Sequence, residues 1–386
     1  MLQSHRSLSR SPAARAPGPN LSSMEEFIID LLQPRTTAVL LVVIGVSLAI
    51  LAKLADIVVD KAVVLSERSN IPKVVIGATV VSLGTTAPEV AVSVFAAFKG
   101  NPGLAMGNAV GSIICDTGLI LGIACLIQPL TIPSRIANRQ GWVQLGSGLL
   151  LVLLSLPWAS PLSPWTEEAD GTFPRWAGFL FLVLLAIYLV FSVKWSRLKV
   201  NDDAGEAVAE EISAEKPSAE ESSGPEDAAP TSVTLVKLIL AIAGVVVSAN
   251  VLIPAIMVVA ERLAVPESVI ALTIVAFGTS LPELITAIQA ARRGHGDLAV
   301  GNIIGADVLN ALFVAGAAAA VSPSGLTVDK PFFWLSFPTM IVVLIVFRIG
   351  IFVCKDRLPR GFGVVLFGSY VLYLTLTVVT GLKVDH

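Results

Sequence analysis

Long apolar runs, separated by short polar connections, follow one another along most of the chain. Each run is near or above the length that crosses about 30 Å of hydrocarbon as a helix. The pattern predicts ten spanning helices, at residues 38–59, 72–98, 102–127, 142–156, 176–193, 233–259, 266–290, 298–321, 332–347 and 362–379. We therefore expect an all-α membrane protein whose surroundings are the lipid bilayer.

Two polar segments interrupt this pattern. Residues 1–36 begin with a stretch rich in Arg, Ser and Pro, and residues 196–232 are rich in Glu, Asp, Ala, Ser and Pro. Neither composition provides enough apolar surface to order a chain, so both are predicted to be disordered, the first as a leader and the second as a linker. The linker divides the ten helices into two five-helix halves, 37–195 and 233–386.

The composition supports a membrane protein and excludes several other classes. Hydrophobic residues make up 54% of the chain and charged residues 14%, and the mean hydropathy is +0.81, which is far from the values of a soluble protein. Cys115, Cys125 and Cys354 lie in or beside apolar runs without metal-ligand spacing, so no disulfide, cysteine metal site or cofactor is predicted. The net charge of -3 indicates no nucleic-acid partner.

The Lys and Arg residues of the short connections predict an orientation, because the cytoplasmic side carries their excess. Most of them, including Arg139 and Arg292, fall on one side of the predicted helices. The other side has Lys99, Arg175, Arg262, Lys330 and Lys383. We expect a multi-pass protein of the cell (plasma or inner) membrane with both termini outside and the acidic linker in the cytoplasm.

The second and third predicted helices recur as the seventh and eighth. Residues 76–116 match residues 270–310 without a gap, with GTTAPE opposite GTSLPE and GNAVGSIICD opposite GNIIGADVLN. These copies define an alpha-1 repeat at 72–127 and an alpha-2 repeat at 266–321. The loop charges place the tips of the two copies on opposite sides of the membrane, so the halves are predicted to be inverted repeats, which is a transporter architecture.

Each copy carries one glutamate in the middle of its first helix, Glu89 or Glu283. A carboxylate at this depth costs several kcal/mol, and the surrounding helices contain no basic residue that would neutralise it. The two glutamates therefore indicate a cation site.

Other oxygen donors accompany the glutamates. Thr85 and Thr279 precede them by four residues, which places a hydroxyl on the same face of a continuous helix, and Pro88 and Pro282 are expected to free backbone carbonyls. Further donors in the repeats are Ser82, Asn108, Ser112, Asp116, Asn302 and Asn310. Calcium takes six to eight oxygens, and these groups from both halves are able to supply them.

The two motifs resemble those of the cation/calcium exchanger family, GTSxPE followed by GNxxGSNxxN, and are most similar to its prokaryotic sodium/calcium exchanger branch. The resemblance implies that Glu89 and Glu283 are the central calcium ligands, with Thr85 and Thr279 beside them. It further implies a sliding of the first and sixth helices across the bundle. The remaining implied site residues are Thr86, Ser280 and Ser112, with Asp116 and Asn310 facing each other on the third and eighth helices.

Three departures from the family pattern bear on the counter-ion. Ile113 replaces an asparagine, and Ala306 and Asp307 replace serine and asparagine. Ala306 removes a hydroxyl that would bind sodium, and Asp307 adds a carboxylate able to bind a proton. The counter-ion is therefore left open.

The function predicted from these observations is secondary active exchange of Ca²⁺ for Na⁺ by alternating access at a midplane carboxylate site. The alternatives are an H⁺/Ca²⁺ or K⁺-linked exchanger and a cation channel. An intramembrane enzyme is not predicted, because there is no HExxH motif and Asp116 and Asp307 lack the glycine context of an aspartyl membrane protease.

Overall fold

The computed structural model describes residues 23–132, 134–157, 171–197, 230–263, 278–354 and 357–384. In this part of the chain, seven helices are long and apolar enough to cross a membrane, and an eighth span is formed by a bent pair, Lys73–Thr85 with Ala87–Phe98. The protein is therefore an all-helical multi-pass membrane protein. The count of ten spans stays a prediction, because the predicted fourth helix is not among these candidate spans and the seventh is described only from residue 278 onward.

The helices and strands of the N-terminal part of the chain comprise one helix that precedes the expected first half (37–195), followed by the elements of that half. They are α1 (Ser23–Leu32), α2 (Thr37–Ser69), α3 (Lys73–Ile76), the π-helix η1 (Gly77–Val81), α4 (Ser82–Thr85), α5 (Ala87–Phe98), α6 (Pro102–Ile114), the π-helix η2 (Cys115–Ile120), α7 (Leu121–Ile127), β1 (Leu130–Thr131), α8 (Ser134–Ser155), β2 (Gly171–Phe173) and α9 (Arg175–Arg197).

The described elements of the second half repeat much of this order. They are α11 (Thr231–Arg262), α14 (Leu281–Arg292), α15 (Gly296–Leu309), the π-helix η6 (Asn310–Ala315), α16 (Gly316–Val321), β3 (Leu326–Val328), the π-helix η7 (Phe332–Ser336), α17 (Phe337–Cys354), β4 (Arg357–Leu358) and α18 (Arg360–Val384).

Two helices are longer than their apolar runs suggested. α2 continues to Ser69 because its buried face continues through Ala62 and Leu65 after the outer face has become charged. α8 begins at Ser134, well before the predicted start at residue 142. Its early polar residues include Gln140, which is buried and donates to the Ser192 hydroxyl at 3.0 Å. Hydropathy therefore underestimates the length of this helix.

The segments predicted to be disordered fall largely outside the described residues. Contrary to the expectation for residues 1–36, Ser23–Leu32 forms a helix, whose Leu32 packs with Leu40 and Val258. Residues 1–22 lie outside the described part. The predicted linker at 196–232 also lies mostly outside it, since α9 ends at Arg197 and the description resumes at residue 230.

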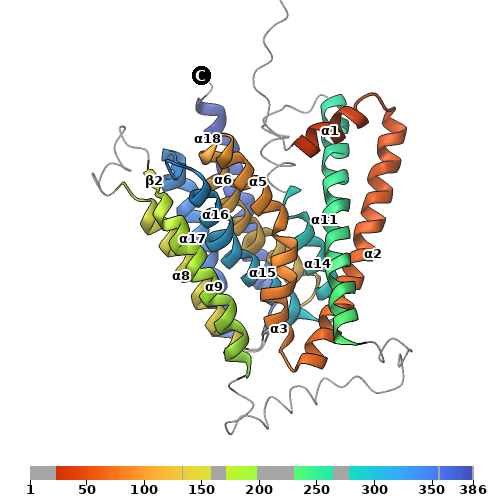
Figure 1. Ribbon diagram of the computed structural model, residues 1–386, viewed down its shortest axis with the longest axis vertical. Coiled ribbons are helices and arrows are strands. Elements are labelled where there is room, and N and C mark those ends of the chain that lie inside the picture. Colours follow the sequence, from red (N-terminus) through yellow and green to blue (C-terminus); the bar gives the residue numbers. More distant parts are fainter. Residues whose placement is uncertain are drawn as a thin grey trace, which may run out of the picture.

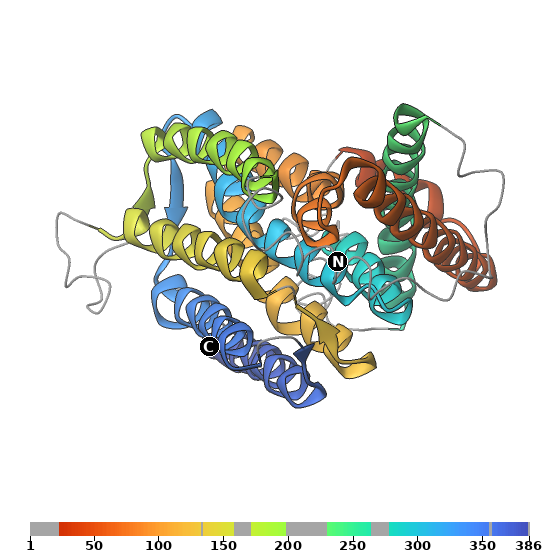
Figure 2. The same cartoon turned by 90° about the horizontal axis from the view of Figure 1, so that it is seen from below.

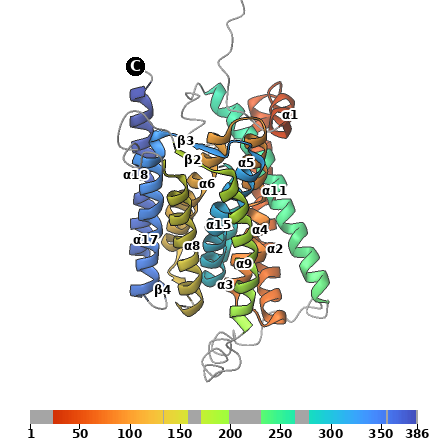
Figure 3. The same ribbon diagram turned by 60° about the vertical axis from the view of Figure 1, so that its left-hand side comes forward.

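Two short antiparallel strand pairs join connections of the first half to connections of the second. Leu130 in β1 is opposite Leu358 in β4, and Gly171 in β2 is opposite Val328 in β3. Figure 3 shows β2 and β3 at one end of the bundle and β4 at the other. The two halves are thus tied together at both ends of the molecule.

α2 and α11 form an antiparallel pair at one side of the bundle (Figure 1). At one end, Arg68 Nη1 donates to Thr234 Oγ1 at 3.0 Å, and at the other end Arg262 Nη1 donates to Thr37 Oγ1 at 3.0 Å. Between them, the Ser248 hydroxyl donates to the backbone oxygen of α2 at residue 47, at 3.0 Å. The pair is therefore bonded at its ends and in its middle.

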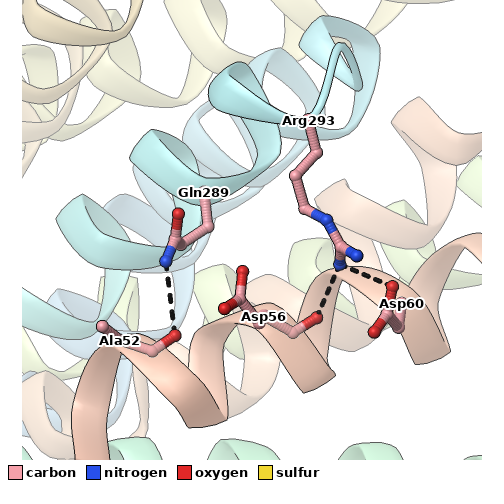
Figure 4. Close-up of polar contacts among 5 residues, drawn as sticks. All are labelled: Ala52, Asp56, Asp60, Gln289 and Arg293. Atoms are coloured by element: carbon pink, nitrogen blue, oxygen red, sulfur yellow. Dashed lines mark hydrogen bonds and ion pairs between the residues drawn. The ribbon is translucent and has the colours of Figure 1, made fainter. Parts of the chain in front are cut away.

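The α2–α11 pair is held to the rest of the bundle at one end of α14 (Figure 4). Arg293 Nη1 donates to the Asp56 carbonyl oxygen at 3.1 Å and pairs with the Asp60 carboxylate. One turn earlier, Gln289 Nε2 donates to the Ala52 carbonyl oxygen at 3.3 Å.

α15 lies inside the bundle, between the α2–α11 pair and the outer helices α17 and α18 (Figure 2). Two of its glycines permit this close packing. A Cβ atom at Gly305 would lie 2.5 Å from the Ala78 backbone, and one at Gly301 would overlap the carbonyl oxygen of Val74. The spacing of four residues between Gly301 and Gly305 therefore lets α15 pack closely against the first helix of the alpha-1 repeat.

Candidate functional site

The first helix of the alpha-1 repeat is interrupted at the motif itself. α4 ends at Thr85, α5 begins at Ala87, and the two segments are bent by 46°. Pro88 lies in the first turn of α5, and Pro282 lies in the first turn of α14. The expectation of prolines inside continuous helices is thus wrong for the first copy. A proline is tolerated in a first turn because its missing N–H would have no intrahelical partner there.

These interruptions place Glu89 and Glu283 in the first turns of α5 and α14. The free backbone N–H groups and the positive end of the helix dipole favour a carboxylate at this position. Both side chains are only 1% exposed. The local structure therefore offsets part of the cost of placing two carboxylates inside the protein.

The two glutamates are linked across the halves by a crossed pair of hydrogen bonds. Thr86 Oγ1 of the first copy donates to Glu283 Oε1 at 3.1 Å. In the matching contact, Ser280 Oγ of the second copy donates to Glu89 Oε1 at 3.4 Å. Each copy thus supplies the hydroxyl that contacts the other copy's carboxylate, so the two glutamates face a common centre.

Thr86 and Ser280 are also the N-cap residues of α5 and α14. An N-cap hydroxyl ordinarily accepts a hydrogen bond from a backbone N–H of its own helix. Neither residue makes this contact, since both hydroxyls are turned to the opposite glutamate. The capping interaction, which contributes about 1 kcal/mol, is given up in favour of the site.

Several buried oxygens around this centre have no hydrogen-bond partner. They are Glu89 Oε2, Glu283 Oε2, Ser112 Oγ, Asp116 Oδ1 and Asn310 Oδ1. A buried polar atom without a partner costs about 1–3 kcal/mol, so such groups are rare in folded proteins. Five of them on residues that the sequence predicts as ligands fit a set of ligands for a hard cation.

The acidic part of this set is small. Among the described residues, no group of three or more His, Cys, Asp or Glu side chains is arranged to hold a metal ion. The candidate ligands combine the two glutamates and the Asp116 carboxylate with the hydroxyl of Ser112 and the amide of Asn310. Such a mixed set is typical of sites for calcium and for alkali cations, which prefer oxygen ligands.

Asp116 and Asn310 lie face to face, as the resemblance implied. Asn310 Nδ2 donates to Asp116 Oδ2 at 3.1 Å, and both side chains are buried. Asp116 is the second residue of η2, and Asn310 is the first residue of η6. π-helical turns are frequent at functional sites, and here they occur at matching places in the two repeats.

Thr85 and Ser82 lie next to the helix break, and the Thr85 side chain also contacts the Glu283 carboxylate. The Thr85 hydroxyl donates to the Ser82 carbonyl oxygen and the Ser82 hydroxyl to the Thr79 carbonyl oxygen, each at 3.4 Å. Because the helix breaks at Thr86, the spacing of four residues no longer places Thr85 and Glu89 on one helical face. Ser82 and Thr85 are nevertheless fully buried next to the break.

Asn108 ties the two copies together beside the glutamates. Its amide nitrogen donates to the Glu89 carbonyl oxygen at 3.3 Å and to Ser93 Oγ at 2.9 Å, while its oxygen accepts from Thr279 Oγ1 at 3.3 Å. In the other copy, Asn302 Nδ2 donates to Thr286 Oγ1 at 3.2 Å. These amides position the first turns of α5 and α14.

One group of site-adjacent residues was missed by the sequence analysis. Asp307 Oδ2 accepts hydrogen bonds from Thr117 Oγ1 and from Gln144 Nε2, and Gln144 Nε2 also lies 3.3 Å from Thr117 Oγ1. Asp307 was noted as a departure, but its partners were not. The available signal was Gln144 itself, an amide within the apolar run 142–156.

Comparison with known proteins assigns the chain to a family along most of its length. The family model described as "Sodium/calcium exchanger protein" matches residues 39–194 and 233–379. The chain belongs to this family. The resemblance inferred from the two motifs is therefore confirmed, and the exchanger is a cation transporter and not an enzyme.

Individual relatives cover nearly the whole exchanger. It is 34% identical over 342 residues to the inner membrane protein YrbG of Escherichia coli, with 88% of this chain and 96% of that protein covered. It is 30% identical over 343 residues to the sodium/calcium exchanger MaX1 of Methanosarcina acetivorans, with 85% and 95% covered. The sodium-calcium exchanger NCX_Mj, in a structure soaked with Na⁺ and Sr²⁺, matches with a TM-score of 0.68 at 25% identity, with 88% and 99% covered.

Proposed function

We propose that this exchanger moves Ca²⁺ across the membrane in return for Na⁺, at a site centred on Glu89 and Glu283. The observation that carries the proposal is the crossed contact of each glutamate with the hydroxyl of the other repeat, at 3.1 Å and 3.4 Å. Together with the unpartnered oxygens of Ser112, Asp116 and Asn310, this centre has enough oxygens for a calcium ion.

Exchange follows if sodium and calcium compete for these oxygens. A calcium ion or sodium ions would neutralise the buried carboxylates, whereas an empty site would leave uncompensated charge inside the protein. Only a loaded site then changes its access from one side to the other. The sodium gradient drives calcium movement because each ion shifts the populations of the two conformations.

The proposed architecture is ten spans in two inverted halves, with both termini outside and the acidic linker in the cytoplasm. The antiparallel arrangement of α2 and α11 supports it, because these helices hold corresponding places in the two halves. In this scheme the α2–α11 pair slides as a unit across the bundle. The contact of Arg293 with Asp60 then acts as a latch that forms at one end of the movement.

Calcium uptake into proteoliposomes tests the proposal. Glu89→Gln and Glu283→Gln each keep the shape of the side chain but remove its charge, so sodium-gradient-dependent uptake should fall to background. Glu67→Gln is the matched control, because Glu67 is an exposed residue near the end of α2. Normal uptake by both site variants would overturn the site assignment.

A second candidate is proton- or potassium-linked calcium exchange. It is favoured by the lost hydroxyl at Ala306 and by the buried carboxylate of Asp307. Replacing the sodium gradient by a pH gradient or a potassium gradient separates the candidates. Calcium flux that follows one of these gradients and ignores sodium would favour the second candidate, and flux without any counter-ion would indicate a channel.

A further inference from the structure

Asp307 stands in a polar cluster beside the central site, on the side of α8. It is 2% exposed, and its contacts are with Thr117 in η2 and Gln144 in α8, which are 0% and 3% exposed. Both contacts are made by Oδ2. The other oxygen, Oδ1, is buried without a hydrogen-bond partner.

The equivalent positions of the two repeats do not form a second cluster of this kind. The residue that aligns with Asp307 is Ile113, and the residue that aligns with Thr117 is Ala311. Both of these apolar side chains are fully buried in the core. The cluster therefore joins Asp307 of the second repeat to two polar side chains of the first half, and it is not part of the paired arrangement around the two glutamates.

The hydrogen bonds of Asp307 favour its ionised form, because a hydroxyl and an amide N–H both donate to the carboxylate. Among the described residues, no basic side chain bonds to it. Arg348 is a buried basic residue, but its guanidinium donates to Asn138 and lies 4.4 Å from the centre of the Trp142 ring. Burial opposes this charge, so the ionised carboxylate is stable only when a cation from solution accompanies it.

We propose that Asp307, Thr117 and Gln144 form a second cation site, which takes a monovalent alkali cation and is separate from the calcium site. The single carboxylate matches one positive charge. The cluster offers one carboxylate, one hydroxyl and one amide, which is fewer oxygens and less charge than calcium requires. The π-helical turn η2 at Thr117 is a backbone feature that is frequent at functional sites.

The location explains how this second ion affects exchange. Asp307 lies one helical turn before Asn310, and Thr117 directly follows Asp116. Asn310 and Asp116 are in turn bonded to each other within the central site. A cation bound at Asp307 and Thr117 would therefore affect the positions of Asn310 and Asp116, which belong to the central site.

This inference rests on the proposed exchange function, and its experiment separates the two. Proteoliposomes with Asp307→Asn and Thr117→Val are assayed for calcium uptake against internal Na⁺, K⁺ or a proton gradient. The same preparations are assayed for exchange of labelled for unlabelled calcium, which needs no counter-ion. Asp30→Asn is the matched control, because Asp30 is exposed on α1.

We expect both cluster variants to raise the half-saturating concentration of the activating alkali cation by about tenfold or more, as for the loss of a contact to a charged group. The half-saturating calcium concentration of calcium–calcium exchange should stay within about twofold of wild type. An unchanged alkali-cation dependence in both variants would overturn the second site. A variant effect that appears only with a proton gradient would also overturn it, because the site then holds a proton.

Failure of the proposed function has a different signature. If wild-type protein shows no calcium–calcium exchange, or shows it equally in Glu89→Gln, the central site itself is wrong.

Binding without transport provides a second readout in case Asp307→Asn is not recovered in a folded form. Thermal unfolding of purified protein is followed in calcium-free detergent solution with increasing Na⁺ or K⁺, since a bound ion stabilises the folded state. The increase of the unfolding midpoint with alkali cation should be smaller in Thr117→Val than in wild type. Equal increases would overturn the proposal.

Discussion

The two repeats are alike where they carry the glutamates and differ in the helix that follows. Thr86 and Ser280 hold the same place in their copies and make the same crossed contact. In the next helix, by contrast, the serine, isoleucine and aspartate of the first copy are alanine, aspartate and asparagine in the second. The residues that differ are Ser112, Ile113 and Asp116, opposite Ala306, Asp307 and Asn310.

This difference separates two tasks. A site that must open to either side of the membrane is served by equivalent glutamates from oppositely oriented halves, so symmetry is kept there. The proposed alkali-cation site has no such requirement, and Asp307 has polar partners in the first half, whereas the equivalent Ile113 is part of the apolar core. Symmetric positions of the two repeats should therefore respond alike to substitution, and asymmetric positions should respond differently.

The largest expected effect is at the glutamates. Glu89→Gln and Glu283→Gln should weaken calcium binding by about a hundredfold or more, and by similar factors, because each removes one charge from the same desolvated centre. Isothermal titration of the purified variants with calcium measures this. A large loss in one variant and none in the other would show that the copies are not equivalent.

A large loss of stability is expected at one glycine but not at its counterpart. Gly301→Ala forces a methyl group into the backbone of Val74 and should lower the free energy of unfolding by about 3 kcal/mol or more. Gly107→Ala, at the matching position, has only Phe332 nearby at 3.8 Å and should cost less than about 1 kcal/mol. Thermal unfolding in detergent compares them. Equal destabilisation would contradict the observed difference in packing.

The crossed hydroxyls should give intermediate effects of equal size. Thr86→Val and Ser280→Ala each remove a hydrogen bond to a carboxylate, which contributes about 1.5–3 kcal/mol, so calcium affinity should fall about tenfold in each. Thr86→Ser keeps the hydroxyl and should restore most of the affinity. Calcium titration of the three variants measures these affinities. An affinity of Thr86→Ser as low as that of Thr86→Val would show that the hydroxyl of Thr86 does not support the glutamate.

The smallest effect is expected at the latch. Arg293→Gln removes a pair whose side chains are 38% and 48% exposed, and such pairs contribute about 0–1 kcal/mol. The maximal exchange rate should therefore change only a few-fold. Lys99, at the matching position of the first repeat, lies over the Phe95 ring, so Lys99→Gln should leave the rate unchanged. Equal changes of the exchange rate in both variants would contradict a role of the Arg293–Asp60 contact in the movement.

Much of this molecule could be predicted from repetition in its sequence. The glutamates and their motifs occur twice, and the span 102–127 was predicted with the bounds that the structure gives to α6, η2 and α7. The break at Thr86 could not be predicted with certainty, because a proline in a helix either kinks it or begins a new one. The direction in which Thr86 and Ser280 point depends on contacts between segments almost two hundred residues apart.

Helix α8 shows a second feature that could not be predicted from the sequence, which is the burial of polar side chains. Gln140 and Gln144 are buried and bonded to Ser192, Thr117 and Asp307, which belong to distant segments. Hydropathy treats such amides as exposed polar groups, so the predicted helix began too late. The partners of Asp307 were missed for the same reason.

The central claim is that Glu89 and Glu283 hold one calcium ion between the two halves. A crystal structure of the exchanger soaked with strontium, with the metal located by its anomalous scattering, tests it most directly. We predict one principal strontium peak bound by carboxylate oxygens of both glutamates, near the distances of about 2.3–2.6 Å found for calcium. A peak bound by only one glutamate, or by neither, would contradict the account.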